Sequence, residues 1–388
     1  MPAERPCTVA AATGPADSRD APAAVALLPD RRRLASRVAL VALVLAAFAL
    51  AIASLPGLSE VRDRLAGASP GWLALVLALQ IASCMSFVVA FRAIFCRRMP
   101  WRLSYDVAIS VQSTNVLLPS GGAGGLAVAI WALTRTGIAS EVVVRRGIAM
   151  WLLTSAVNFA TAVLAGGLLA LGILVGGGSL ALTAGPAICA ALVIAGVLAL
   201  PRALSTARAM RPRAGRAGRL IAWLRRALHG GVRDAVALGR ARDPHVVGGS
   251  IGFMVFDVAA LGAAFLAIGQ LPPVGVLLIA YVIGQLGGLI PVPGGIGGAD
   301  GGLIAALVLY GTPLSSAAAA VLAFRAFQLG VPAVLGGLAL ARLPGIVERA
   351  PDLGEPAPAG PCAGRGVRRH GPSRTADVAT RSGDRALA

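Results

Sequence analysis

Long apolar runs, separated by short polar or glycine-rich stretches, follow one another from Val38 to Ala341. A helix needs about 20 consecutive apolar residues to cross the hydrocarbon core of a bilayer. Uninterrupted runs that approach or exceed this length are Val38–Leu55, Gly71–Phe91, Gly147–Val175, Ser179–Leu200, Val246–Gln270 and Leu314–Ala341. The pattern predicts an all-α polytopic membrane protein with about six full spans.

Two further apolar segments are broken in the middle. Val107–Trp131 is interrupted by the sequence LPSGGAGG at 118–125, and Val274–Tyr310 by PVPGGIGG at 291–298. Proline interrupts a helix, and the backbone groups freed at membrane depth must face protein or a watery cavity. We therefore expect two re-entrant hairpins. The N-termini of their half-helices would attract anions such as a lipid phosphate; close packing of the glycine loops alone is the alternative.

The broken segments predict an inverted repeat. GGAGG at 121–125 matches GGIGG at 294–298, and each break lies between two spans. The halves are about 71–175 and 246–341, and an odd number of crossings separates their starts, so that the second half is inverted. Inverted repeats with broken helices at matching positions are typical of transporters. The alternative is chance recurrence in a chain with 49 glycines.

Composition and charge narrow the class of protein. Hydrophobic residues make up 57% of the 388 residues and charged residues 13%, about half the charged share of soluble domains, which excludes a soluble globular protein. The net charge of +18 comes from arginines between the spans, without a nucleic-acid motif, so no nucleic-acid partner is expected. By the positive-inside rule both termini face the cytoplasm and the hairpins open to opposite sides.

We accordingly expect a multi-pass protein of the bacterial plasma membrane. A transmembrane domain at 38–343 lies between disordered cytoplasmic ends at 1–37 and 344–388. The basic loop 201–245 contains an amphipathic stretch suited to anionic lipids of the inner leaflet; a solvated linker helix is an equal alternative. The five cysteines form no C-x-x-C pair, and the three histidines lie outside the spans. No metal site, cofactor or catalytic set is therefore expected, and the chain is not expected to be an enzyme.

Three charged residues lie inside the spans of the second half, namely Asp257, Asp300 and Arg325. Each costs about 2.5–3.5 kcal/mol to insert near the bilayer centre, so that pairing among them is expected. Two interpretations remain open. The three residues form either a structural staple, or a phosphate anchor at Arg325 whose counter-ions are the two acids.

The order of these features resembles a known family. PVPGGIGGAD at 291–300, followed by Gly311, Arg325 and Gly336, is similar to the second-half signature of the flippase-like family. This family comprises the transmembrane part of lysylphosphatidylglycerol synthases and its stand-alone relatives. LPSGG at 118–122, with Arg135 downstream, is similar to the first-half signature. The resemblance covers about Val38–Arg342 and implies a protein that binds or translocates a lipid.

The expected lipid-binding residues combine the broken segments, the charged residues and the resemblance. They are Pro119, Gly121, Gly122, Arg135, Pro293, Gly294, Gly295, Gly297, Asp300 and Arg325, with Asp257 and Asn158 as structural or counter-ion groups. Two features depart from the family pattern. Asp300 replaces a glutamate, and Thr154-Ser155 stands where a Glu-Arg pair is common. No synthase domain is expected after Ala341, so that the chain is not expected to make lysylphosphatidylglycerol.

The leading hypothesis is a flippase that moves a phospholipid or a lipid-linked head group between leaflets. The rival is an accessory subunit or an enzyme of membrane lipid or glycan assembly, acting on polyprenyl-linked or hopanoid substrates. A homodimer is a further expectation.

Overall fold

The computed structural model describes residues 59–117, 122–176, 180–206, 216–287 and 298–354, and every regular element in these ranges is a helix. The elements of the first half are α3 (Ser59–Ala66), α4 (Pro70–Phe95), α5 (Trp101–Leu117), α6 (Ala123–Thr134) and α7 (Ser140–Ala170). They are followed by α8 (Leu180–Thr206), α9 (Arg216–Arg240), α10 (Pro244–Ala267), α11 (Val274–Gly287), α12 (Gly298–Leu309) and α13 (Leu314–Glu348). The prediction of an all-α polytopic membrane protein is confirmed.

The long helices agree with the predicted spans. Among the described residues, α4, α7, α10 and α13 are long and apolar enough to cross a membrane. The predicted span Ser179–Leu200 corresponds to α8, a helix of 27 residues with an apolar stretch at Ala184–Val197. The first predicted span, Val38–Leu55, lies outside the described residues.

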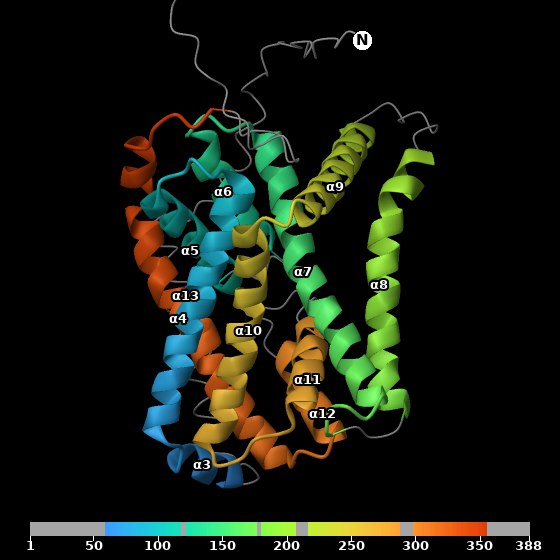
Figure 1. Cartoon of the computed structure of the whole chain (residues 1–388). Coiled ribbons are helices and arrows are strands. Elements are labelled where there is room, and N and C mark those ends of the chain that lie inside the picture. Colours follow the sequence, from blue (N-terminus) through green and yellow to red (C-terminus); the bar gives the residue numbers. More distant parts are fainter. Residues whose placement is uncertain (1–58, 118–121, 177–179, 207–215, 288–297, 355–388) are drawn as a thin grey trace, which may run out of the picture.

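Each broken segment is a pair of short helices. α5 and α6 have 17 and 12 residues, and α11 and α12 have 14 and 12, fewer than the roughly 20 that a full span needs. Figure 1 places the α5–α6 pair at the upper end of the bundle and the α11–α12 pair at the lower end. The two hairpins therefore lie at opposite ends, as an inverted repeat requires.

Packing between the halves has the same symmetry. α4 packs along α10, its counterpart in the other half; α5 packs on α13, and α11 packs on α7. The α4–α10 contact is close because α10 carries glycines there. A Cβ on Gly249 would lie 2.7 Å from the Ala90 amide nitrogen, and one on Gly252 would lie 2.8 Å from Ser86 Oγ.

The same turn ends the second helix of both hairpins. Gly137, after α6, has a φ of 86°, and Gly311, after α12, has a φ of 90°. In both turns the glycine amide donates to the carbonyl three residues earlier, and the next amide donates to the carbonyl five residues earlier. This is the Schellman motif, which favours glycine in the left-handed position. The equivalence of the halves thus extends to single hydrogen bonds.

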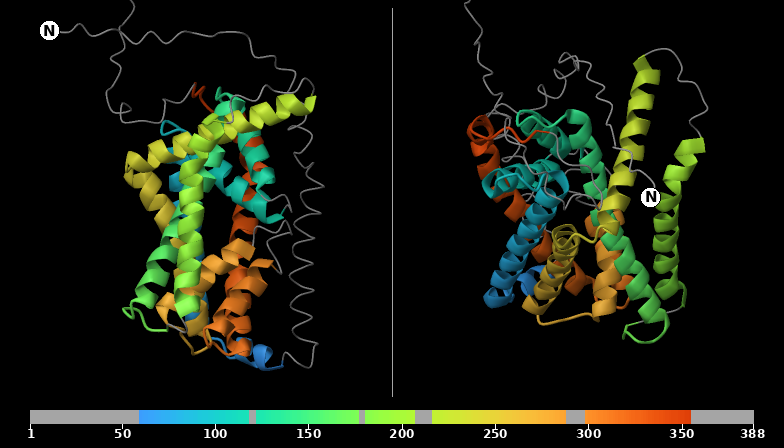
Figure 2. Two further views of the ribbon diagram at one scale, coloured as in Figure 1. Left: turned by 90° about the vertical axis from the view of Figure 1, so that its right-hand side faces the viewer. Right: turned by 45° about the horizontal axis from the view of Figure 1, so that its top comes forward.

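The basic segment contains the helix α9, which lies across the upper end of the bundle (Figure 2). Asp234 of α9 is buried beside two arginines of α7. Arg145 Nε donates to Asp234 Oδ2 at 2.6 Å, and Arg146 Nε lies 3.6 Å from the same oxygen. One face of α9 is therefore fixed on α7 by an acid between two bases, while Arg226, Arg233 and Arg240 are exposed on the helix.

Several predicted boundaries were wrong. α7 begins at Ser140 rather than Gly147, and α13 continues to Glu348 rather than ending at Ala341. α13 continues because Leu343 and Val347 are buried, so that its apolar face extends past Arg342. The prediction that 344–388 is disordered is wrong as far as 354, because Leu353 donates a backbone hydrogen bond of 2.8 Å to Thr136. Residues 1–37 and 355–388 lie outside the described residues.

Candidate functional site

The charged residues of the second half meet beside the second hairpin. Arg325 on α13 forms an ion pair with Asp300 on α12, in which Arg325 Nε donates to Asp300 Oδ1. Their side chains are mostly buried, with 17% and 14% of their surfaces exposed. Asp300 lies in the first turn of α12, where the positive end of the helix dipole favours a carboxylate. The expected pairing of these residues is therefore present.

The pair lies at membrane depth. Arg325 is the twelfth residue of α13, which begins at the lower end of the bundle. At 1.5 Å per residue, Arg325 lies about 17 Å along its helix, close to the middle of a hydrocarbon core about 30 Å thick. Asp257 is the fourteenth residue of α10, which begins at the upper end, and lies about 20 Å along its helix. The two helices thus bring these residues to a similar depth from opposite ends.

Gln328 joins Arg325 to Asp257. Arg325 Nη1 donates to Gln328 Oε1 at 2.6 Å, and Gln328 Nε2 donates to Asp257 Oδ2 at 2.7 Å. Arginine can only donate, so that the amide oxygen of Gln328 must face Arg325 and its nitrogen must face Asp257. The orientation of this amide is therefore fixed by its neighbours. Through its two hydrogen bonds the amide connects the Arg325–Asp300 ion pair to Asp257.

Asp257 is buried, with 3% of its surface exposed, and three helices supply its hydrogen-bond donors. Besides Gln328 on α13, Tyr281 on α11 donates to Oδ2 at 2.9 Å, and Ser83 on α4 lies 3.0 Å from Oδ1. We call Ser83, Asp257, Tyr281, Asp300, Arg325 and Gln328 the Asp257–Arg325 network. It links five helices, α4, α10, α11, α12 and α13, and crosses the interface between the two repeat halves.

Sequence reasoning missed the neutral members of this network, which are Ser83, Tyr281 and Gln328. A signal existed in the sequence. Gln328 follows Arg325 by one helical turn, and Tyr281 precedes Gln285, which donates to its hydroxyl at 2.6 Å, by four residues. Polar side chains in apolar helices are costly to bury without partners. Their spacing could therefore have marked the faces that meet Asp257.

The structure does not bring the predicted first-half residues to this network. Arg135 caps α6 at the upper end of the bundle, where its side chain is exposed and stacks on Trp131 at 4.5 Å from the ring centroid. Gly122, with a φ of 92°, is the exposed residue that precedes α6. Asn158 lies half-buried on α7. Arg135 and Arg325 therefore lie at different levels of the bundle and do not form one anion site.

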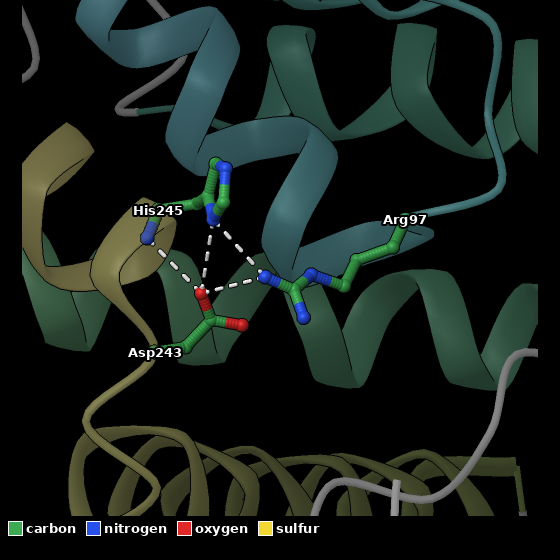
Figure 3. Close-up of polar contacts among 3 residues, drawn as sticks. All are labelled: Arg97, Asp243 and His245. Atoms are coloured by element: carbon green, nitrogen blue, oxygen red, sulfur yellow. Dashed lines mark hydrogen bonds and ion pairs between the residues drawn. The ribbon is translucent and has the colours of Figure 1, made fainter. Parts of the chain in front are cut away.

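A second polar cluster connects the halves at the upper end (Figure 3). Arg97, after α4, donates to Asp243 Oδ1 at 2.9 Å and lies 3.0 Å from His245 Nδ1. The same carboxylate oxygen caps α10 by accepting a hydrogen bond of 3.0 Å from the His245 amide. Arg97 and His245 are both exposed. The cluster therefore holds the end of α4 against the start of α10 at the surface, outside the Asp257–Arg325 network.

The remaining predicted site residues lie outside the described residues, and they are Pro119, Gly121, Pro293, Gly294, Gly295 and Gly297. Both breaks nevertheless adjoin described helices. Gly298 begins α12 directly after one break, and Asp300 follows within the same turn. The second break thus leads into the ion pair.

The comparisons with known proteins agree with this architecture. No curated protein matches the chain significantly. A family model described as the lysylphosphatidylglycerol synthase TM region matches residues 37–336, a range that contains both hairpins and the Asp257–Arg325 network. This range covers most of the chain, and the chain therefore belongs to the family of lysylphosphatidylglycerol synthase transmembrane regions.

Proposed function

We propose that the chain is a non-enzymatic carrier that moves an anionic phospholipid, or a lipid-linked phosphate head group, between the leaflets of the membrane. The observation that carries the proposal is the Arg325–Asp300 ion pair. It lies at membrane depth, next to the N-terminus of a half-helix, in an inverted repeat. Repeat interfaces with discontinuous helices are where transporters bind their substrates.

The chemistry of the pair suits a phosphate. A guanidinium presents several donors in one plane and binds phosphate in a bidentate manner. Arg325 uses Nε toward Asp300 and Nη1 toward Gln328, so that an incoming phosphate would compete with a carboxylate and an amide for the same donors. Family membership supports a lipid as the substrate, because the matched region belongs to proteins named after a phospholipid.

The distribution of arginine gives the orientation that we propose. The arginine-rich helix α9, which Arg145 of α7 contacts, lies at the upper end of Figure 1, whereas α3 at the lower end carries two acids and two bases. By the positive-inside rule the upper end is cytoplasmic, in the bacterial plasma membrane. The exposed arginines of α9 then face the inner leaflet, whose anionic lipids would attract them.

The decisive experiment compares two conservative variants in a leaflet-translocation assay with fluorescent phosphatidylglycerol in proteoliposomes. Arg325→Lys keeps the charge but removes bidentate binding. Losing a charge-assisted hydrogen bond costs about 1.5–3 kcal/mol, or about tenfold to a hundredfold in binding. The control is Arg342→Lys, because Arg342 is an exposed arginine of the same helix. If Arg325→Lys translocates the lipid at the wild-type rate, the Arg325–Asp300 pair has a structural role and is not the phosphate anchor.

A further inference from the structure

The Asp257–Arg325 network carries an uneven charge. The apolar segments of the second half, Val246–Gln270, Val274–Tyr310 and Leu314–Ala341, contain two carboxylates, Asp257 and Asp300, and one basic side chain, Arg325. Asp300 meets Arg325 directly, whereas Asp257 reaches it through the neutral amide of Gln328. With both acids ionised, these spans hold one excess negative charge, which is costly at membrane depth. One bound proton would neutralise it.

Ser83 marks the place where this proton can bind. Its Oγ lies 3.0 Å from Asp257 Oδ1 and 3.0 Å from the carbonyl oxygen of Phe253. A serine has one hydroxyl hydrogen and can donate to only one of these oxygens at a time. When Asp257 is ionised, Ser83 donates to Oδ1. When Oδ1 carries a proton, Asp257 donates to Ser83 and Ser83 donates to Phe253, so that both states are hydrogen-bonded.

We propose that Asp257 is a proton-binding site, in which the proton lies between Oδ1 and the Ser83 hydroxyl, and that the site takes up its proton when an anionic lipid head group binds at Arg325. The coupling rests on the proposed function, whereas the proton site rests on the geometry of Asp257. A phosphate at Arg325 adds negative charge to spans that already hold an excess, which favours protonation of Asp257. By linkage, protonation strengthens binding of the anion by the same factor.

The donors around Asp257 fit a proton rather than a metal cation. Na⁺ or another hard cation needs several oxygen lone pairs directed at one point. The nitrogen of Gln328 faces Asp257 and cannot ligate a cation, because Arg325 fixes the orientation of that amide. Tyr281 accepts from Gln285 and donates to Asp257. Tyr281 and Gln328 therefore both direct hydrogens toward the carboxylate, as a proton site allows and a metal site does not.

The groups that can influence this proton are few. Cys84 on α4 follows Ser83 in the chain, Tyr281 faces Asp257 from α11, and Arg325 is joined to it from α13 through Gln328. Asp300 on α12 pairs with Arg325, so that it is connected to Asp257 through Arg325 and Gln328. α7 also packs on α10, through Thr161 and Met254, and has no ionisable side chain between Gly147 and Ala170. Within the described part of the chain, these four residues are therefore the ionisable neighbours of Asp257 that we identify.

The proton site can be tested without any lipid substrate. Infrared difference spectra of the full-length protein in lipid-free micelles, from about pH 9 to about pH 5, should show the carbonyl band of a protonated carboxyl group growing as the pH falls. The band should be missing in Asp257→Asn and shifted in Ser83→Ala, which lacks the proton's hydrogen-bond acceptor. The matched control is Asp106→Asn, another buried aspartate, which should keep the band. A pH-dependent band that survives Asp257→Asn would overturn the proposal, as would the absence of any titration in wild type.

The coupling is tested by adding short-chain phosphatidylglycerol to the protein in a weakly buffered solution with a pH indicator. Wild type and Asp106→Asn should take up about one proton per bound lipid, and their affinity should tighten by up to about tenfold for each pH unit decrease. Asp257→Asn, a neutral isostere of the protonated acid, should bind the lipid without proton uptake or pH dependence. Lipid binding by wild type without proton uptake would overturn the coupling. If wild type binds no lipid, the proposed function fails, and the infrared band still decides the proton site.

Discussion

The two hairpins share a backbone plan but differ in what holds them. In the first, Asn115 of α5 accepts a hydrogen bond of 2.9 Å from the Gly125 amide at the start of α6, so that a neutral side chain joins the two helices. In the second, Gly287 of α11 lies directly against Gly298 of α12, and the charged pair Asp300–Arg325 lies at the entry to α12. The fold needs the backbone plan that the two hairpins share, and we associate the function with the mostly buried ion pair at the start of α12.

The acids of the two halves show the same contrast. Asp106 on α5 is buried, and its ion-pair partner Arg342 is 59% exposed at a distance of 3.6 Å. Asp300 pairs with an arginine that is only 17% exposed. Each half therefore has an acid paired with an arginine of α13, but the pair at Asp106 is open to water through Arg342, whereas the pair at Asp300 is mostly buried. The comparison predicts that the same substitution has different effects in the two halves.

The largest difference is expected for loss of each arginine. Breaking a buried ion pair by removing one partner costs about 3–5 kcal/mol, because a charge is left in a poorly solvated place. Arg325→Ala should therefore lower the free energy of unfolding by about that amount. Arg342→Ala should lower it by less than about 1 kcal/mol, because exposed pairs contribute little. Denaturation in mixed micelles measures both, and equal losses would mean that the halves do not differ in this way.

A double variant separates stability from transport. Arg325→Ala combined with Asp300→Ala leaves no lone charge in the pair, so that it should recover most of the stability that Arg325→Ala loses. It should not recover translocation of phosphatidylglycerol, because the guanidinium is still missing. A double variant that transports like wild type would contradict the assignment of Arg325 as the phosphate anchor.

A medium effect is expected where α13 meets the first hairpin. A Cβ on Gly336 would collide with the Ser113 side chain and lie 2.7 Å from the carbonyl oxygen of Ile109 on α5, whereas a Cβ on Gly337 meets nothing within 4 Å. Gly336→Ala should therefore cost about 1–3 kcal/mol through overpacking. Gly337→Ala, the matched control, should be neutral or stabilising by up to about 1 kcal/mol, because alanine favours the helix. Thermal unfolding in detergent measures both, and similar melting temperatures would refute the close α5–α13 contact.

Much of the architecture was predictable, because it follows from rules that act along the chain. Apolar length gave the spans, the glycine and proline breaks gave the hairpins, and the matched breaks gave the repeat halves. The boundaries were less predictable because tertiary contacts set them. α13 continues past Pro344 because Leu343 and Val347 are buried. This burial depends on the packing of other helices and cannot be predicted from the local sequence.

The candidate site was predictable only in its charged part. Asp257, Asp300 and Arg325 stand out in apolar sequence because burying a charge is costly. The roles of Ser83, Tyr281 and Gln328 depend on which faces of four different helices meet, which a single sequence does not specify. Arg135 was expected in the site from the family resemblance, but the fold leaves it exposed at the end of α6.

A smaller effect is expected at the Schellman turns that the halves share. Alanine in a left-handed conformation costs about 1–2 kcal/mol, so that Gly137→Ala and Gly311→Ala should both destabilise. A Cβ on Gly137 would also collide with the Asp352 side chain, whereas one on Gly311 meets nothing within 4 Å. Gly137→Ala should therefore have the lower melting temperature. The melting temperature of the double variant Gly137→Ala with Asp352→Ala should approach that of Gly311→Ala. A remaining difference in melting temperature would show that the two turns differ for another reason.

The smallest effect is expected at the starts of α7 and α13. Glu141 lies in the first turn of α7, whereas the start of α13 has Ser315, whose hydroxyl donates to Glu60 of α3 at 2.8 Å. This hydrogen bond, together with one from Arg64, holds the pKa of Glu60 below its ordinary value of 4.5. A depressed pKa means that the folded state favours the ionised carboxylate, so that the contribution of Glu60 to stability is fully present above the ordinary value.

That contribution disappears as the pH falls through the lowered pKa of the folded state. Glu60→Gln should therefore melt slightly below wild type at neutral pH, and the gap should close in the acid range because wild-type Glu60 is then protonated as well. Because Glu60 is fully exposed, solvent screening keeps the gap small. Melting curves in detergent from neutral to acid pH measure it, with Ser315→Ala as a second variant that removes the same hydrogen bond from the other side. A gap that is constant over the whole pH range would show that the link between α3 and α13 does not depend on the charge of Glu60.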